Sequence, residues 1–213
     1  MKLKNKNFHI ACDGGAATGK STGAKMISKK FKLKFLSSGL LYRYAALMIL
    51  KNKPKDYLRH LNYKFKKLNY KKLNTMNLHT QQISRVATKI AKISKIRNIL
   101  KKYQLNFAKK NKRCCIEGRD IATKILPKSD IKFFFICDLN TASKRRYKEL
   151  KKDNNKITLN DVKRALRLRN KIDTTRKNSP LLKHRDSIVI NTGKLNKRAM
   201  ITKMSSHIEE FLD

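Results

Sequence analysis

Residues 14–21 have the types and the spacing that hold a polyphosphate. The run GGAATGKS fits the pattern G-x-x-x-x-G-K-[ST], in which small residues let the backbone turn tightly and point its N–H groups inward. Lys20 would reach the β- and γ-phosphates, and the Ser21 hydroxyl would bind Mg²⁺. The apolar run Ile10–Cys12 before the loop and the helical pattern after it are the context that this motif requires. We therefore expect a nucleoside triphosphate to bind at Gly14, Gly15, Ala16, Ala17, Thr18, Gly19, Lys20, Ser21 and Thr22.

Three further polar clusters fall at the ends of expected strands or on helices beside them. In α/β folds, ligands gather at the carboxyl ends of the strands. Arginine suits a phosphate because its guanidinium can donate two parallel hydrogen bonds. Each cluster alone is also compatible with an ordinary surface pair. The clusters are Ser38-Gly39-Leu40-Leu41-Tyr42-Arg43, Gly118-Arg119-Asp120, and Arg169, Asp173 and Arg176, whose i, i+4, i+7 spacing predicts one helical face.

The elements that must position these clusters alternate between strands and helices. Such alternation predicts an α/β fold with a five-stranded parallel sheet. The expected strands are Ile10–Cys12, Leu33–Leu36, Arg113–Glu117, Ile131–Cys137 and Ser187–Ile190. The expected helices are Ser21–Lys30, Leu40–Leu50, a run from Thr80 with a break near Ser94, Thr141–Lys151, Leu159–Lys171 with Asp153-Asn154-Asn155 before it, and a closing helix around 201–211.

Length and charge limit the alternatives. A chain of 213 residues fits one domain with inserted lobes, and Lys51–Asn77, which has no clean period, is either such a lobe or a mobile segment. The net charge is +40, from 54 basic and 14 acidic residues. Because lysine is spread over the whole length, we interpret this charge as a compositional bias. We expect weak, salt-sensitive binding to polyanions and no specific nucleic-acid partner.

Cysteine use and hydropathy point to the cytoplasm. Cys12, Cys114, Cys115 and Cys137 all lie in apolar runs without C-x-x-C spacing, so we expect small buried residues rather than metal ligands or disulfides. No apolar run approaches the roughly 20 residues of a membrane span, and the basic start Met1–Asn7 leads straight into the phosphate loop without a signal-peptide core. We expect a cytoplasmic protein that does not bind membranes.

Taken together and in this order, the motifs resemble the bacterial-type cytidylate kinase family of P-loop nucleoside monophosphate kinases. The resemblance covers most of the chain. Adenylate, guanylate and thymidylate kinases share the phosphate loop but not this series. The motifs are DGGAATGKST, SSGLLYR, TQQISRVATKIAKISKIR, IEGRDIAT and RNKIDTTR followed by Ser179-Pro180-Leu181.

The resemblance implies transfer of the γ-phosphoryl group of ATP to CMP or dCMP in pyrimidine nucleotide metabolism, with ATP and Mg²⁺ as cofactors and a monomeric enzyme. It also implies a single P-loop kinase domain over residues 1–213, with a nucleotide-binding insert at 51–78 and a mobile lid at about 145–176. The catalytic residues implied are Lys20, Arg145 and Arg176, with Arg146 also in the lid.

The resemblance further implies how CMP is held. Cytosine offers an amine donor and two acceptors, which a carboxylate or hydroxyl and an arginine would match. The implied roles are Arg43 and Arg119 at the acceptor phosphate, Arg169 and Asp173 at the ribose, Ser38, Thr88, Arg97 and Asp120 around the base, and Arg176 at the base or the transferring phosphoryl group.

The sequence departs from the family pattern at several positions. Gly15 stands where proline is usual, Ser37 where aspartate is common, Ala122 where glycine is usual, and Asn191 where aspartate is usual. Ala142 stands where the family has an arginine just before the lid, which puts that one lid contact in doubt. None of these departures removes a residue that is assigned to the chemistry.

Two other functions stay open at this point. Another small-substrate P-loop kinase, acting on UMP or a different acceptor, would share the fold and differ at Thr88, Arg97 and Asp120. A basic nucleic-acid-binding protein would instead need aromatic residues interleaved with clustered arginine on one face. No such face is visible in the sequence.

Overall fold

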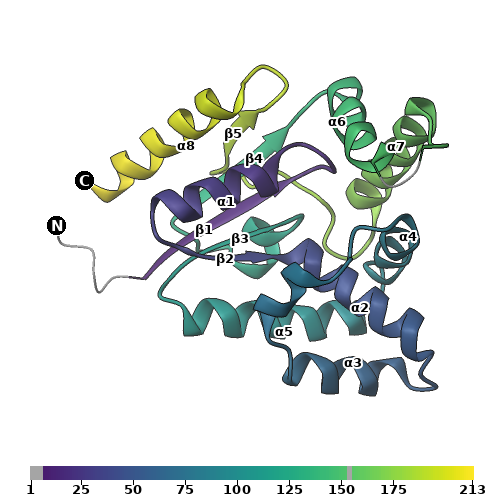
Figure 1. Ribbon diagram of the computed structural model, residues 1–213. Coiled ribbons are helices and arrows are strands. Elements are labelled where there is room, and N and C mark those ends of the chain that lie inside the picture. Colours follow the sequence, from purple (N-terminus) through teal and green to yellow (C-terminus); the bar gives the residue numbers. More distant parts are fainter. Residues whose placement is uncertain (1–6, 153–154) are drawn as a thin grey trace. The chain divides into compact units, whose positions relative to one another are not determined.

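The computed structural model describes residues 7–152 and 155–213 (Figure 1). Most of the basic start of the chain, and Asp153 and Asn154 between two late helices, lie outside the described residues. The chain divides into two compact units. The sheet unit comprises Met1–Leu36 and Asn111–Asp213, and the helical unit comprises Ser37–Lys110. We describe each unit by itself.

The sheet unit is built on a five-stranded sheet in the order β2-β3-β1-β4-β5, which confirms the predicted fold class. The pairs β1–β3, β1–β4 and β4–β5 are parallel. Because β1 is the central strand, its carboxyl end lies between those of β3 and β4, and Asp13 is in register with Gly118. The strands are β1 Phe8–Gly14, β2 Lys34–Ser37, β3 Arg113–Gly118, β4 Ile131–Ile136 and β5 Ile188–Asn191.

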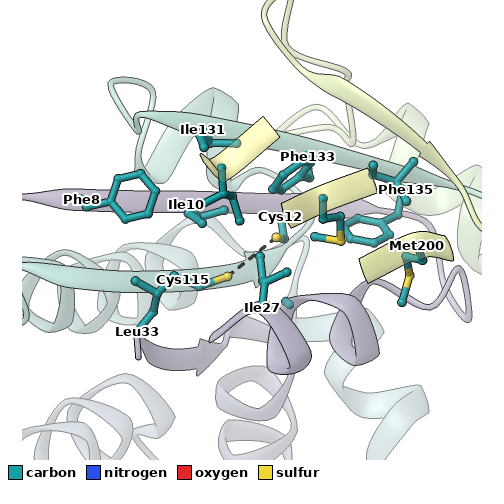
Figure 2. Packing of buried hydrophobic residues seen from close by; sticks show 14 residues of the cluster. Phe8, Ile10, Cys12, Ile27, Leu33, Cys115, Ile131, Phe133, Phe135 and Met200 are labelled. Carbon is teal, nitrogen blue, oxygen red and sulfur yellow. Dashed lines mark hydrogen bonds between the residues drawn. The ribbon is translucent and has the colours of Figure 1, made fainter. Parts of the chain in front are cut away.

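Helices α1 and α8 bury their apolar sides against this sheet (Figures 1 and 2). Ile27 of α1 and Met204 of α8 are both fully buried in the same cluster as Phe133 and Phe135 of β4. Helices α6 and α7 pack on each other around Val162 and the phosphate loop's Ala16. The helices of this unit are α1 Lys20–Lys30, α6 Leu139–Lys151, α7 Leu159–Thr175, α8 Lys197–Leu212 and the short π-helix η2 Ile121–Ile125.

The cysteines are free, as expected, and three of the four are buried. Cys137 is only partly buried, at the end of β4. Figure 2 shows Cys12 and Cys115 facing each other inside the core, with their Sγ atoms 3.7 Å apart. They behave as the small apolar residues that the sequence predicts.

The helical unit contains four α-helices and a 3₁₀-helix. The segment that sequence reasoning left open folds into α3 and η1, because Leu61 and Phe65 are buried and Phe65 stacks edge-on with Tyr44 and Tyr103 at centroid distances of 5.6 and 5.8 Å. The break expected near Ser94 separates α4 from α5. The elements are α2 Ser38–Asn52, α3 Tyr57–Lys66, η1 Tyr70–Thr75, α4 Gln81–Ile90 and α5 Ser94–Lys110.

Side-chain caps define where several helices begin. Ser37, which stands at the end of β2, accepts a hydrogen bond from the Leu40 N–H, so α2 begins at Ser38, two residues before the predicted start at Leu40. Thr80 caps α4 in the same way through the Ile83 N–H. Within the residues that the structure describes, no helix is both long and apolar enough to cross a membrane.

Candidate active site

The phosphate loop leaves β1 through two glycines that no other residue could replace without strain. At Gly14, a Cβ atom would lie 2.5 Å from the Phe135 carbonyl oxygen, because β1 and β4 approach closely here. Gly19 precedes α1 with φ 78°, a left-handed conformation that glycine adopts at little cost. Between them, the Thr18 hydroxyl donates to the Gly15 carbonyl at 3.0 Å. The loop is therefore shaped by its own backbone before any ligand arrives.

Lys20 is buried beneath this loop. Its Nζ donates to the Gly15 carbonyl at 3.2 Å and lies 3.8 Å from the Glu117 carboxylate. Burial, and next the nearby Arg119 charge, lower the pKa of Lys20 to about 7, although Glu117 opposes the shift. A bound polyphosphate would favour the charged form. Ser21 and Thr22, one and two positions further along α1, are exposed.

Glu117 was missed by sequence reasoning. It precedes Gly118 at the carboxyl end of β3 and is only 3% exposed. The signal for Glu117 is its place at the end of a mostly apolar strand. Such a carboxyl group lies at the sheet edge where the phosphate loop begins.

Arg119, Asp173 and Arg176 form one ion-pair cluster. Arg119 Nε lies 2.8 Å from Asp173 Oδ2, and Arg176 NH1 lies 3.4 Å from Asp173 Oδ1. Burial opposes the ionisation of Asp173, but the charges of Arg119, Arg169 and Arg176 hold its pKa below the usual range. The cluster thus presents guanidinium groups around one buried carboxylate.

Arg176 does not lie within the helix, which corrects the expectation of one helical face. Helix α7 ends at Thr175, and Arg176 has an extended backbone with ψ 137°. Its side chain turns back toward Asp173 and donates to the Ser179 carbonyl at 2.7 Å. Arg169 stays on α7 and is half-buried.

Asp120 ends the turn that begins at Gly118 and is 4% exposed. The π-helix η2 follows directly, and its first N–H groups bond to a distant carboxylate, Asp13 of β1. Burial raises the pKa of Asp13 to about 7, and the two hydrogen bonds from the backbone partly offset that shift. Sequence reasoning missed Asp13 too, because nothing local announces a partner more than 100 residues away.

Arg145 and Arg146, the two arginines that are expected in a lid, have different surroundings. Arg145 donates to the Thr192 hydroxyl at 2.9 Å and to the Thr192 carbonyl at 2.7 Å, and Thr192 in turn donates to the Thr18 carbonyl at 2.8 Å. Arg146 pairs with Glu149 on the outer side of the same helix at 2.8 Å. Of the two, Arg145 is the one that is linked to the phosphate loop.

Asn170 of α7 also reaches the phosphate loop. Its Oδ1 accepts a hydrogen bond from the Ala16 N–H at 3.2 Å. A Cβ atom at Gly15 would lie 3.3 Å from the same oxygen, so the absence of a side chain at position 15 leaves room for this contact.

The remaining predicted residues lie in the helical unit. Arg43 of α2 donates to the Leu78 carbonyl at 2.9 Å and to the Ser84 hydroxyl at 2.6 Å. The Thr88 hydroxyl donates to the Ser84 carbonyl at 2.9 Å, so Arg43 and Thr88 share Ser84, which sequence reasoning did not select.

Arg97 and Ser38 complete this set. Arg97 of α5 is 7% exposed, donates to the Ala91 carbonyl at 3.1 Å and lies over the Tyr42 ring, 5.6 Å from its centroid. Ser38, the first residue of α2, is 4% exposed. Helices α2 and α5 therefore each contain a buried arginine, Arg43 and Arg97.

Comparison with known proteins finds one matching family and named relatives. The family model described as "Cytidylate kinase" matches residues 10–210. A protein of Rickettsia africae (strain ESF-5) named "Cytidylate kinase" is 35% identical over 209 residues, which are 96% of this chain and 93% of the relative.

Solved structures with low sequence identity share the fold. An uncharacterized protein from Eubacterium ventriosum ATCC 27560 has a TM-score of 0.58 at 17% identity, and covers 96% of this chain and 99% of its own. A shikimate kinase from Bacteroides thetaiotaomicron has a TM-score of 0.51 at 10% identity, with coverages of 96% and 98%. At such identities the likeness concerns the fold.

Proposed function

The chain belongs to the cytidylate kinase family, and from this premise we propose that it transfers the γ-phosphoryl group of ATP to CMP or dCMP. The products are ADP and CDP or dCDP. The observation that supports this most is the buried cluster of Arg119, Asp173 and Arg176, in the same unit as a phosphate loop with a buried lysine.

On the donor side, the loop Gly14–Thr22 binds the ATP phosphates through its N–H groups and Lys20. Lys20 stabilises charge on the β- and γ-phosphates as the transfer proceeds. Arg145, linked to the loop through Thr192, adds a second cation on the donor side. These are preorganised charges, so they need little rearrangement during the reaction.

Mg²⁺ fits the donor set of this loop. Ser21 offers an exposed hydroxyl oxygen next to the buried Lys20, and oxygen is the ligand that Mg²⁺ prefers, together with phosphate oxygens of the substrate. When bound, the ion would offset the negative charge of the ATP phosphates. We assign it to Ser21.

On the acceptor side, an oxygen of the CMP phosphate attacks the γ-phosphorus in line, and the bond to the β–γ bridging oxygen breaks to release ADP. No general base is needed, because the attacking oxygen is already anionic. Arg119 and Arg176 already face a carboxylate, Asp173, with a geometry that suits a phosphate oxygen equally well. We assign the acceptor phosphate to Arg119 and Arg43, and the ribose to Asp173 and Arg169.

Recognition of the base follows from hydrogen-bonding capacity. Ionised Asp120 can only accept, which suits the cytosine amine and repels the uracil carbonyl. Arg97 can only donate, which suits the unprotonated N3 of cytosine. Thr88 and Ser38 can do both, so they discriminate least. Arg176 serves the base or the transferring phosphoryl group.

We extend the proposal to the organisation of the enzyme. Residues 51–78 belong to an acceptor-binding insert, residues 145–176 to a lid over ATP, and the protein acts as a cytoplasmic monomer without a specific nucleic-acid partner. The helix pair α6–α7, which packs on itself around its own small cluster, supports the lid.

An assay panel tests the proposal. Purified protein is supplied with Mg·ATP and, in turn, CMP, dCMP, UMP, AMP, GMP and dTMP, and product formation is followed by ion-exchange chromatography. We expect kcat/KM for CMP or dCMP to exceed that for UMP by about 10²-fold, because two buried groups would be mispaired with uracil. Preference for UMP or for a different acceptor would replace this proposal with that of another small-substrate kinase.

A further inference from the structure

Asp13 makes a polar contact between the donor and acceptor parts of the sheet unit. It is the last residue of β1 before Gly14, and it is 1% exposed. Its Oδ1 accepts from the Ile121 N–H at 2.9 Å, and its Oδ2 accepts from the Ala122 N–H at 2.7 Å. One carboxylate thus connects the residue before the phosphate loop to the segment after Arg119 and Asp120.

These bonds replace a cap that the local sequence does not provide. Asp120 occupies the N-cap position of η2, yet its side chain makes no capping hydrogen bond there. The first N–H groups of a helical turn need an acceptor, and an anionic one is favoured at that end. Asp13 supplies both acceptor oxygens from the neighbouring strand.

The hydrogen bonds of Asp13 hold the turn Gly118–Asp120. In the sheet register Asp13 lies opposite Gly118, and its side chain binds the backbone on the far side of Arg119 and Asp120. The turn Gly118–Asp120 is therefore fixed at both ends to β1. Arg119 and Asp120 are the residues that we assign to the phosphate and the base of the acceptor.

We propose that Asp13 is a positioning residue that sets the Gly118–Asp120 turn for the acceptor nucleotide and leaves the donor site to the phosphate loop itself. This inference rests on the proposed function. A change at Asp13 should therefore raise KM for the acceptor CMP and leave KM for the donor ATP nearly unchanged. A residue that served stability alone would affect both substrates or neither.

The test is Asp13→Asn, which keeps the shape of the side chain. The amide has one acceptor oxygen, and its NH₂ group then faces an N–H donor, so one of the two bonds is lost and the turn shifts. We expect KM for CMP to rise about tenfold or more, since small misplacements in a site are costly, while KM for ATP stays within about twofold. Steady-state kinetics with each substrate varied in turn measures both.

A matched control exists at the other end of the same strand. Asp130 accepts a hydrogen bond from the His9 N–H at 2.7 Å, so it also ties a carboxylate to the β1 backbone. Asp130→Asn removes charge from a comparable bond away from the site. We expect both KM values to stay unchanged in that variant.

A second variant keeps the inference testable if Asp13→Asn does not fold. Replacing Ala122 with lactic acid by amber suppression exchanges its N–H for an ester oxygen and leaves Asp13 intact. It should raise KM for CMP and not KM for ATP, as Asp13→Asn does. Equal rises for both substrates, or no rise in either, would overturn the positioning role alone. If the wild-type protein phosphorylates no nucleoside monophosphate, the proposed function and this inference fall together.

Discussion

The two units hold their candidate site residues in different ways. In the sheet unit, buried or partly buried cations face buried anions: Lys20 lies near Glu117, and Arg119 and Arg176 flank Asp173. In the helical unit, Arg43 donates to a carbonyl and a hydroxyl, and Arg97 donates to a carbonyl. Charges that balance each other in a buried place are costly to separate, whereas hydrogen bonds to neutral groups are cheaper to lose.

This difference suggests a division of labour. The sheet unit keeps a charged site assembled in the absence of ligand, because Lys20, Arg119 and Arg176 already have anionic neighbours that a phosphate can replace. The helical unit keeps its arginines in place with backbone and hydroxyl acceptors. Variants in the two units should therefore differ in which property they change and by how much.

The largest effect is expected at Lys20. Lys20→Ala removes a preorganised cation from the phosphates, so kcat should fall by about 10²-fold or more while the fold survives. Steady-state kinetics and thermal melting measure the two quantities. Lys25→Ala, on the exposed side of the same helix, is the control and should keep wild-type kcat. Near-wild-type turnover of Lys20→Ala would remove the phosphate loop from the mechanism.

Asp173→Asn tests the ion-pair cluster of the sheet unit directly. It leaves Arg119 and Arg176 without their shared carboxylate, so the free energy of unfolding should fall by about 3 kcal/mol at pH 7. Arg43→Gln in the helical unit removes the hydrogen bonds to the Leu78 carbonyl and the Ser84 hydroxyl, and the loss of these two bonds should cost about 1 kcal/mol. Urea denaturation compares the two variants, and equal losses would contradict the contrast between the units.

The same variant has a defined pH dependence. The pKa of Asp173 lies below its ordinary value of 3.8, so the unfolded chain binds the proton more readily than the folded one. Its stabilisation is therefore complete above pH 3.8 and is lost as the pH falls through the lower, folded pKa. The difference between wild type and Asp173→Asn should stay constant from pH 8 to about pH 5 and shrink only in stronger acid.

A smaller effect is expected on base choice. Asp120→Asn offers a donor to the uracil carbonyl, so it should narrow the CMP/UMP ratio of kcat/KM by about tenfold, chiefly by weakening CMP. Thr88→Val in the helical unit should change the ratio least, because a hydroxyl can rotate to either base. An unchanged ratio in Asp120→Asn would mean that Asp120 does not read the base.

The smallest effect concerns charge outside both sites. If the +40 net charge is a compositional bias, binding to duplex DNA should be weak and should vanish in moderate salt, while phosphorylation of CMP persists. Fluorescence anisotropy with labelled DNA, measured beside the kinase assay at 50 and 300 mM NaCl, follows both. Sequence-selective binding that survives the higher salt would favour the nucleic-acid alternative.

Sequence alone determined the features that depend on neighbours along the chain. The phosphate loop is a spacing of glycines and Lys20, the strands are short apolar runs, and the helices follow a period of about 3.6 residues. Each of these is decided within a few residues, so local chemistry is sufficient to predict it. The fold of the segment at 51–77 stayed open, although Asp56 caps α3 and the buried residues Leu61 and Phe65 lie four positions apart. The rings of Tyr44 and Tyr103 that cover Phe65 come from two other helices, which local sequence cannot show.

Only the tertiary structure decided which of these residues meet. The strand order places β1 beside β3, and this alone brings Lys20 to Glu117 and Asp13 to the N–H groups of Ile121 and Ala122. Likewise, Arg119 after β3 reaches Asp173 of α7, although the two residues are 54 positions apart in the chain. Hydrogen bonds and ion pairs act over a few ångströms of space, whatever the separation along the chain, and the folded sheet sets those distances.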